Sequence, residues 1–115
     1  MKKNLLIWVM SVLAGLAFLG AGGAKLAGAP AMVAVFEKVG VGQWFRYVTG
    51  LLEVLGAIAL FVPRIRFYGA AMLATVMIGA VVSHLTVLGG SPVAPLVLFA
   101  MTGAIAWLSK PAQVY

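Results

Sequence analysis

Four long apolar runs take up most of this 115-residue chain. A helix needs about 20 apolar residues to cross the hydrocarbon core of a bilayer, and the runs have about that length. Hydrophobic residues make up 64% of the chain and charged residues only 9%, against roughly 25% charged residues in soluble domains. The sequence therefore predicts an all-α membrane protein, in which residues 1–115 form one domain with four transmembrane helices packed as a bundle. The predicted spans are residues 5–24, 43–62, 67–88 and 92–109.

The first apolar run, 5–24, has a competing interpretation as the core of a signal peptide. Lys2 and Lys3 precede it, and small residues that suit a cleavage site follow it at 22–24 and 27–29. The run is longer than the roughly 7–15 apolar residues of a signal-peptide core. We therefore favour a retained first span, and cleavage remains the alternative.

The longest stretch between predicted spans, 25–43, has the pattern of a short amphipathic helix. Pro30 suits the first turn of a helix, because its missing N–H needs no partner there. Apolar residues then recur every three or four positions and form one face: Met32, Val35, Phe36 and Val39. We expect this helix to end at Gly40 and to lie at the membrane interface. A plain connector of the same length is the alternative.

The basic residues determine the expected orientation. The net charge is +6, but the basic residues are scattered at the ends of apolar runs, which argues against the clustered patch of a nucleic-acid partner. Five fall on one predicted side and three on the other: Lys2, Lys3, Arg64, Arg66 and Lys110 against Lys25, Lys38 and Arg46. The more basic side is expected to be cytoplasmic. Both termini of a multi-pass inner-membrane protein would then face the cytoplasm.

Cysteine is absent from the chain, which has one histidine and two acidic residues. Thiol catalysis, disulfide exchange and cysteine metal sites are thereby excluded. The few remaining donors predict no metal site built by the protein. Any redox role would therefore use a bound organic cofactor or belong to a partner protein.

One acidic residue, Glu53, lies in the middle of the second predicted span. An ionisable group there costs about 2.5–3.5 kcal/mol on insertion scales and marks a functional site by default. On a helical wheel Glu53 shares its face with polar or small residues: Arg46, Thr49, Gly50, Gly56 and Ala57. Small residues let membrane helices approach closely, so we expect Glu53 to face the interior of the bundle. We predict it to be the catalytic group of any site there.

Three further polar residues are expected near Glu53, in the outer half of the bundle. Lys25 ends a face of the first span, and its long stem can reach inward. Arg46 lies at the start of the second span, and His84 lies about one turn from the outer end of the third. The sequence therefore predicts a ligand-binding site formed by Lys25, Arg46, Glu53 and His84.

Each of these residues also has a purely structural interpretation. Glu53 would then form an ion pair, with Lys25 or Arg46, that only holds the helices together. Lys25 would be a topology charge, Arg46 an interface anchor and His84 a residue wetted by lipid headgroups. The sequence leaves these alternatives open.

Part of the chain, roughly 18–80, resembles the DoxX-like family. The similarity lies in two elements and four isolated positions: GAGGAKL at 20–26, YVTGLLEVLG at 47–56, and Phe36, Gly40, Leu60 and Pro63. The resemblance implies a four-helix bacterial inner-membrane protein. It carries over Lys25 and Glu53 as a shared polar pair, whereas His84 lies outside the clear match. Some relatives are membrane subunits of quinone-linked sulfur oxidation or join oxidant-defence complexes.

Three functions are compatible with these observations. The first is a redox accessory subunit that binds a quinone or another apolar small molecule, as a non-catalytic part of a quinone-linked oxidoreductase with a protein partner. Glu53 would exchange a proton with the ligand, and Lys25 or His84 would set the pKa of Glu53. The second is a small proton-coupled transporter, although such transporters carry their glutamate in the first span. The third is a structural or assembly subunit without chemistry. Small residues on the third span also favour a homo-oligomer: Gly69, Ala70 and Gly79.

Overall fold

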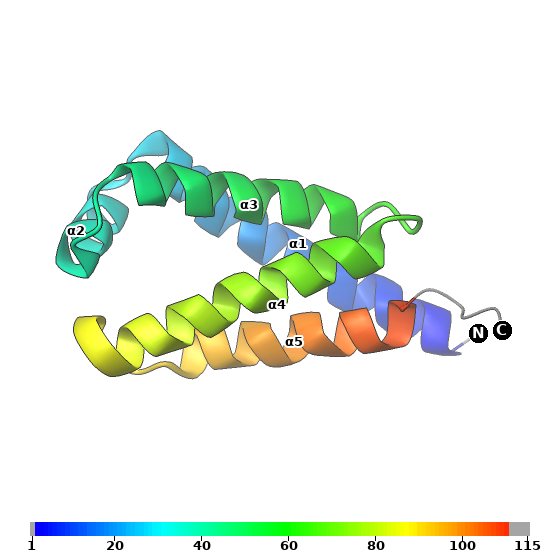
Figure 1. Ribbon diagram of the computed structural model, residues 1–115. Helices are drawn as coiled ribbons and strands as arrows, with labels where there is room; N and C mark the ends of the chain where they lie inside the picture. Colours follow the sequence, from blue (N-terminus) through cyan, green and yellow to red (C-terminus); the bar gives the residue numbers. More distant parts are fainter. Residues whose placement is uncertain (1, 111–115) are drawn as a thin grey trace, which may run out of the picture.

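A computed structural model describes residues 2–110, and every regular element in that range is helical (Figure 1). The elements are α1 (Lys2–Ala27), α2 (Pro30–Val39), α3 (Trp44–Leu60), α4 (Arg66–Ser83), a π-helical turn η1 (His84–Leu88) and α5 (Val93–Ser109). The all-α fold class predicted from the sequence is confirmed.

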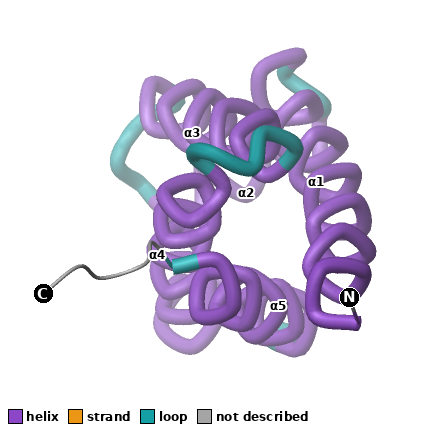
Figure 2. Tube along the Cα trace, turned by 90° about the vertical axis from the view of Figure 1, so that its right-hand side faces the viewer, coloured by secondary structure: helices purple, strands orange, loops and turns teal. Residues whose placement is uncertain are grey.

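The four long helices pack side by side. α1 packs against α3 and α5, and α4 also packs against both α3 and α5 (Figures 1 and 2). α1 begins and α5 ends at the end of the molecule where the α3–α4 turn lies, whereas α2 and η1 lie at the opposite end (Figure 1). The segments that carry the two predicted groups of basic residues are therefore found at opposite ends of the molecule.

Two helical segments are long and apolar enough to cross a membrane, namely α1 and α4 extended through η1 (Arg66–Leu88). α3 and α5 have 17 residues each. At 1.5 Å per residue such a helix is about 26 Å long, which is short for a hydrocarbon core of about 30 Å. The number of spans therefore stays a prediction.

The predicted helix ends differ from the observed ones by a few residues, and the end of α4 differs in kind. The third span was expected to run to Leu88, but α-helical bonding ends at Ser83 and a π-helical turn continues to Leu88. Gly89 closes this turn with a φ of 70°, and its N–H donates to the carbonyl oxygen of His84. π-Helical turns are uncommon and occur frequently at functional sites.

The buried face of α3 is the one that the helical wheel predicts. Glu53 is 2% exposed, and most of the polar or small residues on its face are buried with it: Arg46, Gly50, Gly56 and Ala57. The opposite face carries exposed apolar side chains: Leu51, Leu55 and Ile58. Each long helix also places one large apolar side chain fully inside the molecule: Phe18, Leu60, Leu73 and Ile105.

Glycines allow α1 and α3 to approach closely near the end of the molecule that carries α2. A Cβ atom added at Gly22 would lie 2.8 Å from the backbone oxygen of Gly50. A Cβ atom added at Gly50 would lie 2.9 Å from the Cβ atom of Lys25. This contact brings the last turn of α1 against the middle of α3.

Two of the three small residues of α4 that favoured self-association, Gly69 and Ala70, are packed inside the chain. Ala70 is fully buried, and a Cβ atom added at Gly69 would lie 2.5 Å from the Cβ atom of Ala59. Gly69 therefore serves the contact between α3 and α4, and Ala70 belongs to the buried core. Homo-oligomer formation remains a prediction, with less support from these two positions.

Candidate functional site

A cleft of about 730 Å³ lies between α2, α3 and the C-terminal half of α4 with η1. All four residues of the apolar face predicted for α2 line it: Met32, Val35, Phe36 and Val39. α2 therefore turns this face toward the cleft. Pro30 lies in the first turn of α2, and Gly40 ends the helix in a left-handed conformation, as the sequence predicts.

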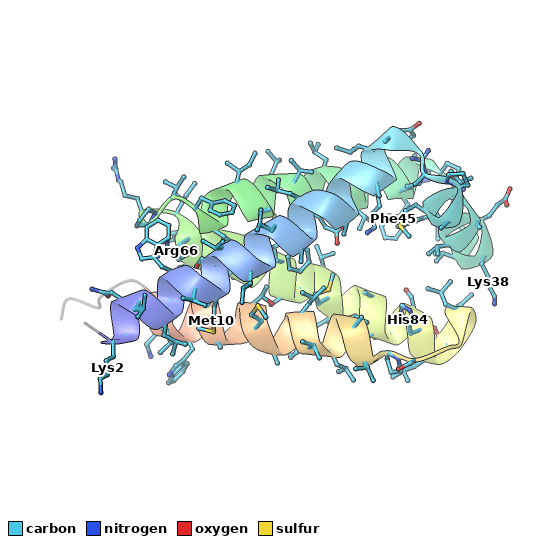
Figure 3. All side chains as sticks on the ribbon, turned by 180° about the vertical axis from the view of Figure 1, so that it is seen from behind. Lys2, Met10, Lys38, Phe45, Arg66 and His84 are labelled. Atoms are coloured by element: carbon cyan, nitrogen blue, oxygen red, sulfur yellow. The ribbon has the colours of Figure 1, made fainter. Side chains whose placement is uncertain are left out.

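One hydrogen bond joins α2 to η1 across the cleft. Figure 3 shows Lys38 on the α2 side and His84 on the α4 side of the cleft. The Lys38 ammonium donates to the carbonyl oxygen of Leu88, at 3.1 Å. The bond is exposed to solvent, so by itself it stabilises the contact between α2 and η1 only weakly.

An ion pair between Lys25 and Glu53 lies in the wall of the cleft. Nζ of Lys25 is 2.7 Å from Oε1 of Glu53, and the two side chains are 14% and 2% exposed. The close approach of α1 and α3 at Gly22 makes this contact possible. Among residues 2–110 the carboxylate has no hydrogen bond to any other group. A carboxylate has room for about four hydrogen bonds, so it retains acceptor capacity for a ligand.

The hydroxyl groups in the cleft wall are already engaged with their own helices. Thr49 donates to the carbonyl oxygen of Phe45, Thr75 to that of Ala71 and Ser83 to that of Gly79, at 2.8–2.9 Å. The wall is consequently apolar apart from its ionisable side chains. Such a surface suits an apolar molecule with few polar groups.

His84 lines the cleft from the first residue of η1. Its Nδ1 atom lies 2.9 Å from the carbonyl oxygen of Ala80, one turn earlier. This contact holds the imidazole ring against α4. His84 and the Lys25–Glu53 pair thus line one cleft, and they belong to η1, α1 and α3. The part of the sequence that resembles the family did not include His84.

Arg46 does not line the cleft, unlike the other three predicted site residues. It is 5% exposed. Its Nη1 group donates to the carbonyl oxygen of Lys25, and its Nε group donates to Oε1 of Gln43 at 2.8 Å. The guanidinium also lies 4.3 Å from the centre of the Tyr47 ring. Arg46 therefore supports the end of α1, on which Lys25 is carried.

Within residues 2–110 no group of three or more His, Cys, Asp or Glu side chains is gathered in a way that could hold a metal ion. The cleft is instead large enough for an organic molecule, since ligand pockets usually measure about 300–1,000 Å³. The residues available to hold such a molecule are the ion pair, His84 and the apolar walls.

The sequence profile of the DoxX-like family matches residues 9–109. The chain belongs to the DoxX-like family. The resemblance found in the sequence is thereby confirmed, and this DoxX-like chain is a membrane protein. Searches of curated proteins and of solved structures found no match.

Two further polar residues of the DoxX-like chain have contacts that sequence reasoning missed. Lys38, counted in the sequence as a topology charge, donates a hydrogen bond across the cleft to Leu88. Arg66, counted only as a topology charge, is 5% exposed; it donates to the carbonyl oxygen of Leu60 and lies 4.2 Å from the ring centre of Trp8. The arginine and the tryptophan are far apart in the sequence, and no local pattern connects them.

Proposed function

We propose that this DoxX-like protein binds an apolar small molecule in the cleft between α2, α3 and α4, and that Glu53 exchanges a proton with the polar group of that molecule. The observation that carries the proposal is the Lys25–Glu53 ion pair in the wall of a large apolar cleft. Ionisable residues inside membrane proteins commonly mark proton relays and ligand sites. A carboxyl group gives or takes a proton directly through a hydrogen bond.

The ligand class favoured by the proposal is a quinone-like ring. The cleft volume fits such a molecule, and Lys25 is a donor that complements a carbonyl oxygen. A quinone, when bound, supplies two-electron redox chemistry that needs protons. In this proposal Glu53 holds the proton, Lys25 orients the ring and the apolar walls exclude water. The chain would then be an accessory subunit of a redox system with a protein partner.

Glutamine at position 53 should reduce ligand retention about tenfold or more, because hydrogen bonds to charged groups contribute about 1.5–3 kcal/mol. Glu53→Gln keeps the shape but cannot titrate. The measurement is mass spectrometry of apolar molecules that copurify with the protein in a mild detergent. Glu37→Gln is the matched control, since Glu37 is exposed and lies outside the cleft lining. Equal retention by the Glu53→Gln protein and the unaltered protein would contradict the proposal.

A multi-pass arrangement in the inner membrane, with both termini in the cytoplasm, is part of the proposal. The orientation rests on the excess of basic residues at the end of the molecule where α1 begins and α5 ends. Reporter fusions at Tyr115 and at Gly90 should then report opposite sides of the membrane. A periplasmic signal from the fusion at Tyr115 would show that the orientation is wrong.

A further inference from the structure

We infer that the cleft selects a ligand that carries a hydroxyl group, and that this hydroxyl donates a hydrogen bond to Nε2 of His84. The inference rests on the proposed function, because it concerns the same cleft. It adds the chemical class of the ligand group that faces α4, opposite the Lys25–Glu53 pair.

The hydrogen bond of the imidazole ring determines which of its nitrogens accepts. Nδ1 of His84 is 2.9 Å from the carbonyl oxygen of Ala80. A carbonyl oxygen can only accept, so Nδ1 must carry the hydrogen. In a neutral imidazole the other nitrogen then has a free lone pair. Nε2 of His84 is therefore an acceptor.

Neighbouring donors do not satisfy this acceptor. Nε2 has no hydrogen bond within residues 2–110, and it is not among the buried polar atoms. The hydroxyl of Ser83 donates to Gly79 and the ammonium of Lys38 donates to Leu88. Nε2 is consequently free to accept a hydrogen bond from a donor group of a ligand.

The two polar positions of the cleft make different demands on a ligand. Lys25 is a donor and takes an oxygen of any kind, whether carbonyl, ether or hydroxyl. His84 takes only a group with a hydrogen to donate, because a carbonyl or ether oxygen would place its lone pairs against that of Nε2. A phenol or hydroquinone-type ring meets both demands. The corresponding ether or carbonyl form meets only the first.

The test uses the fact that His84 is the only histidine of the chain. Protein labelled with ¹⁵N-histidine and placed in lipid nanodiscs at about pH 8 gives histidine NMR signals from this ring alone. We expect the tautomer with hydrogen on Nδ1. Adding 1-naphthol should move the Nε2 resonance upfield, whereas 1-methoxynaphthalene, which cannot donate, should leave it in place. 1-Naphthol should also bind about 5–10-fold more tightly, after correction for partition into lipid.

Two variants locate the binding and identify the selecting residue. A Cβ atom at Gly79 meets nothing within 4 Å, so Gly79→Leu should narrow the cleft and weaken binding of both probes. Gly103→Leu is the matched control, because Gly103 has the same free space and lies outside the cleft lining. His84→Leu should bind both probes equally.

Two results would overturn the inference alone. One is a tautomer with hydrogen on Nε2, and the other is equal affinity of the unaltered protein for the two probes while Gly79→Leu still weakens binding of both. Both results would leave the proposed function standing. Failure of both probes to bind the unaltered protein would count against the cleft as a ligand site and overturn both proposals.

Discussion

Replacing Lys25 with methionine is expected to destabilise the protein by about 3 kcal/mol, because Glu53 would be left buried without a cation. Glu53 is 2% exposed, whereas the Lys25 side chain is 14% exposed and borders the cleft. Lys25 can therefore turn toward the cleft when its partner is lost, and Glu53 cannot. Glu53→Gln should consequently cost less stability than Lys25→Met. Thermal unfolding in detergent, followed by circular dichroism, measures both.

The double variant separates ion pairing from chemistry. Lys25→Met combined with Glu53→Gln leaves no buried charge uncompensated, so the double variant should recover most of the stability lost by Lys25→Met. Ligand retention should not recover, because the titratable group is gone. Recovery of both properties would show that Glu53 is only a structural partner of Lys25, and the proposed function would be wrong.

Valine at position 22 is expected to cost about 3 kcal/mol, the upper end of the usual range for overpacking. The atom that a Cβ would meet at 2.8 Å is the backbone oxygen of Gly50, which cannot rotate away as a side chain can. α1 must then move away from α3, and Lys25 must lose its contact with Glu53. Ligand retention should fall together with the unfolding temperature.

Gly23→Val is the matched control for this substitution. Gly23 is the next residue of α1, and a Cβ atom there meets nothing within 4 Å. The helix-propensity cost of valine is the same at both positions. Equal stability of the Gly22→Val and Gly23→Val proteins would show that the close approach of α1 and α3 contributes nothing to the fold.

Much of the helical framework could be predicted from the sequence, because it depends on local patterns. Apolar runs, Pro30 and Gly40 locate the helices, and the small residues around Glu53 identify the buried face of α3. The pairing of Lys25 with Glu53 was one of the two ion pairs expected for Glu53, and the family resemblance also carried over these two residues as a polar pair.

The rest depends on contacts between segments that are distant in sequence. The wheel places Arg46 on the face of Glu53, but the arginine is about two turns nearer the helix start and meets the end of α1 instead of the cleft. Nothing local distinguishes a lysine that bonds across a cleft, such as Lys38, from one that is free in water. The π-helical turn after Ser83 also has no recognised sequence signal, although it carries His84.

Gln43 connects α2 to the C-terminal end of α1 through a chain of hydrogen bonds. Its Nε2 group donates to the carbonyl oxygen of Val33 in α2, at 3.0 Å, and its Oε1 accepts from Arg46, which in turn holds the carbonyl oxygen of Lys25. A displacement of α2 is therefore transmitted to the backbone of Lys25, which forms the ion pair with Glu53. A protein that binds the outer surface of α2 would thus shift the position of Lys25 relative to Glu53 without entering the cleft.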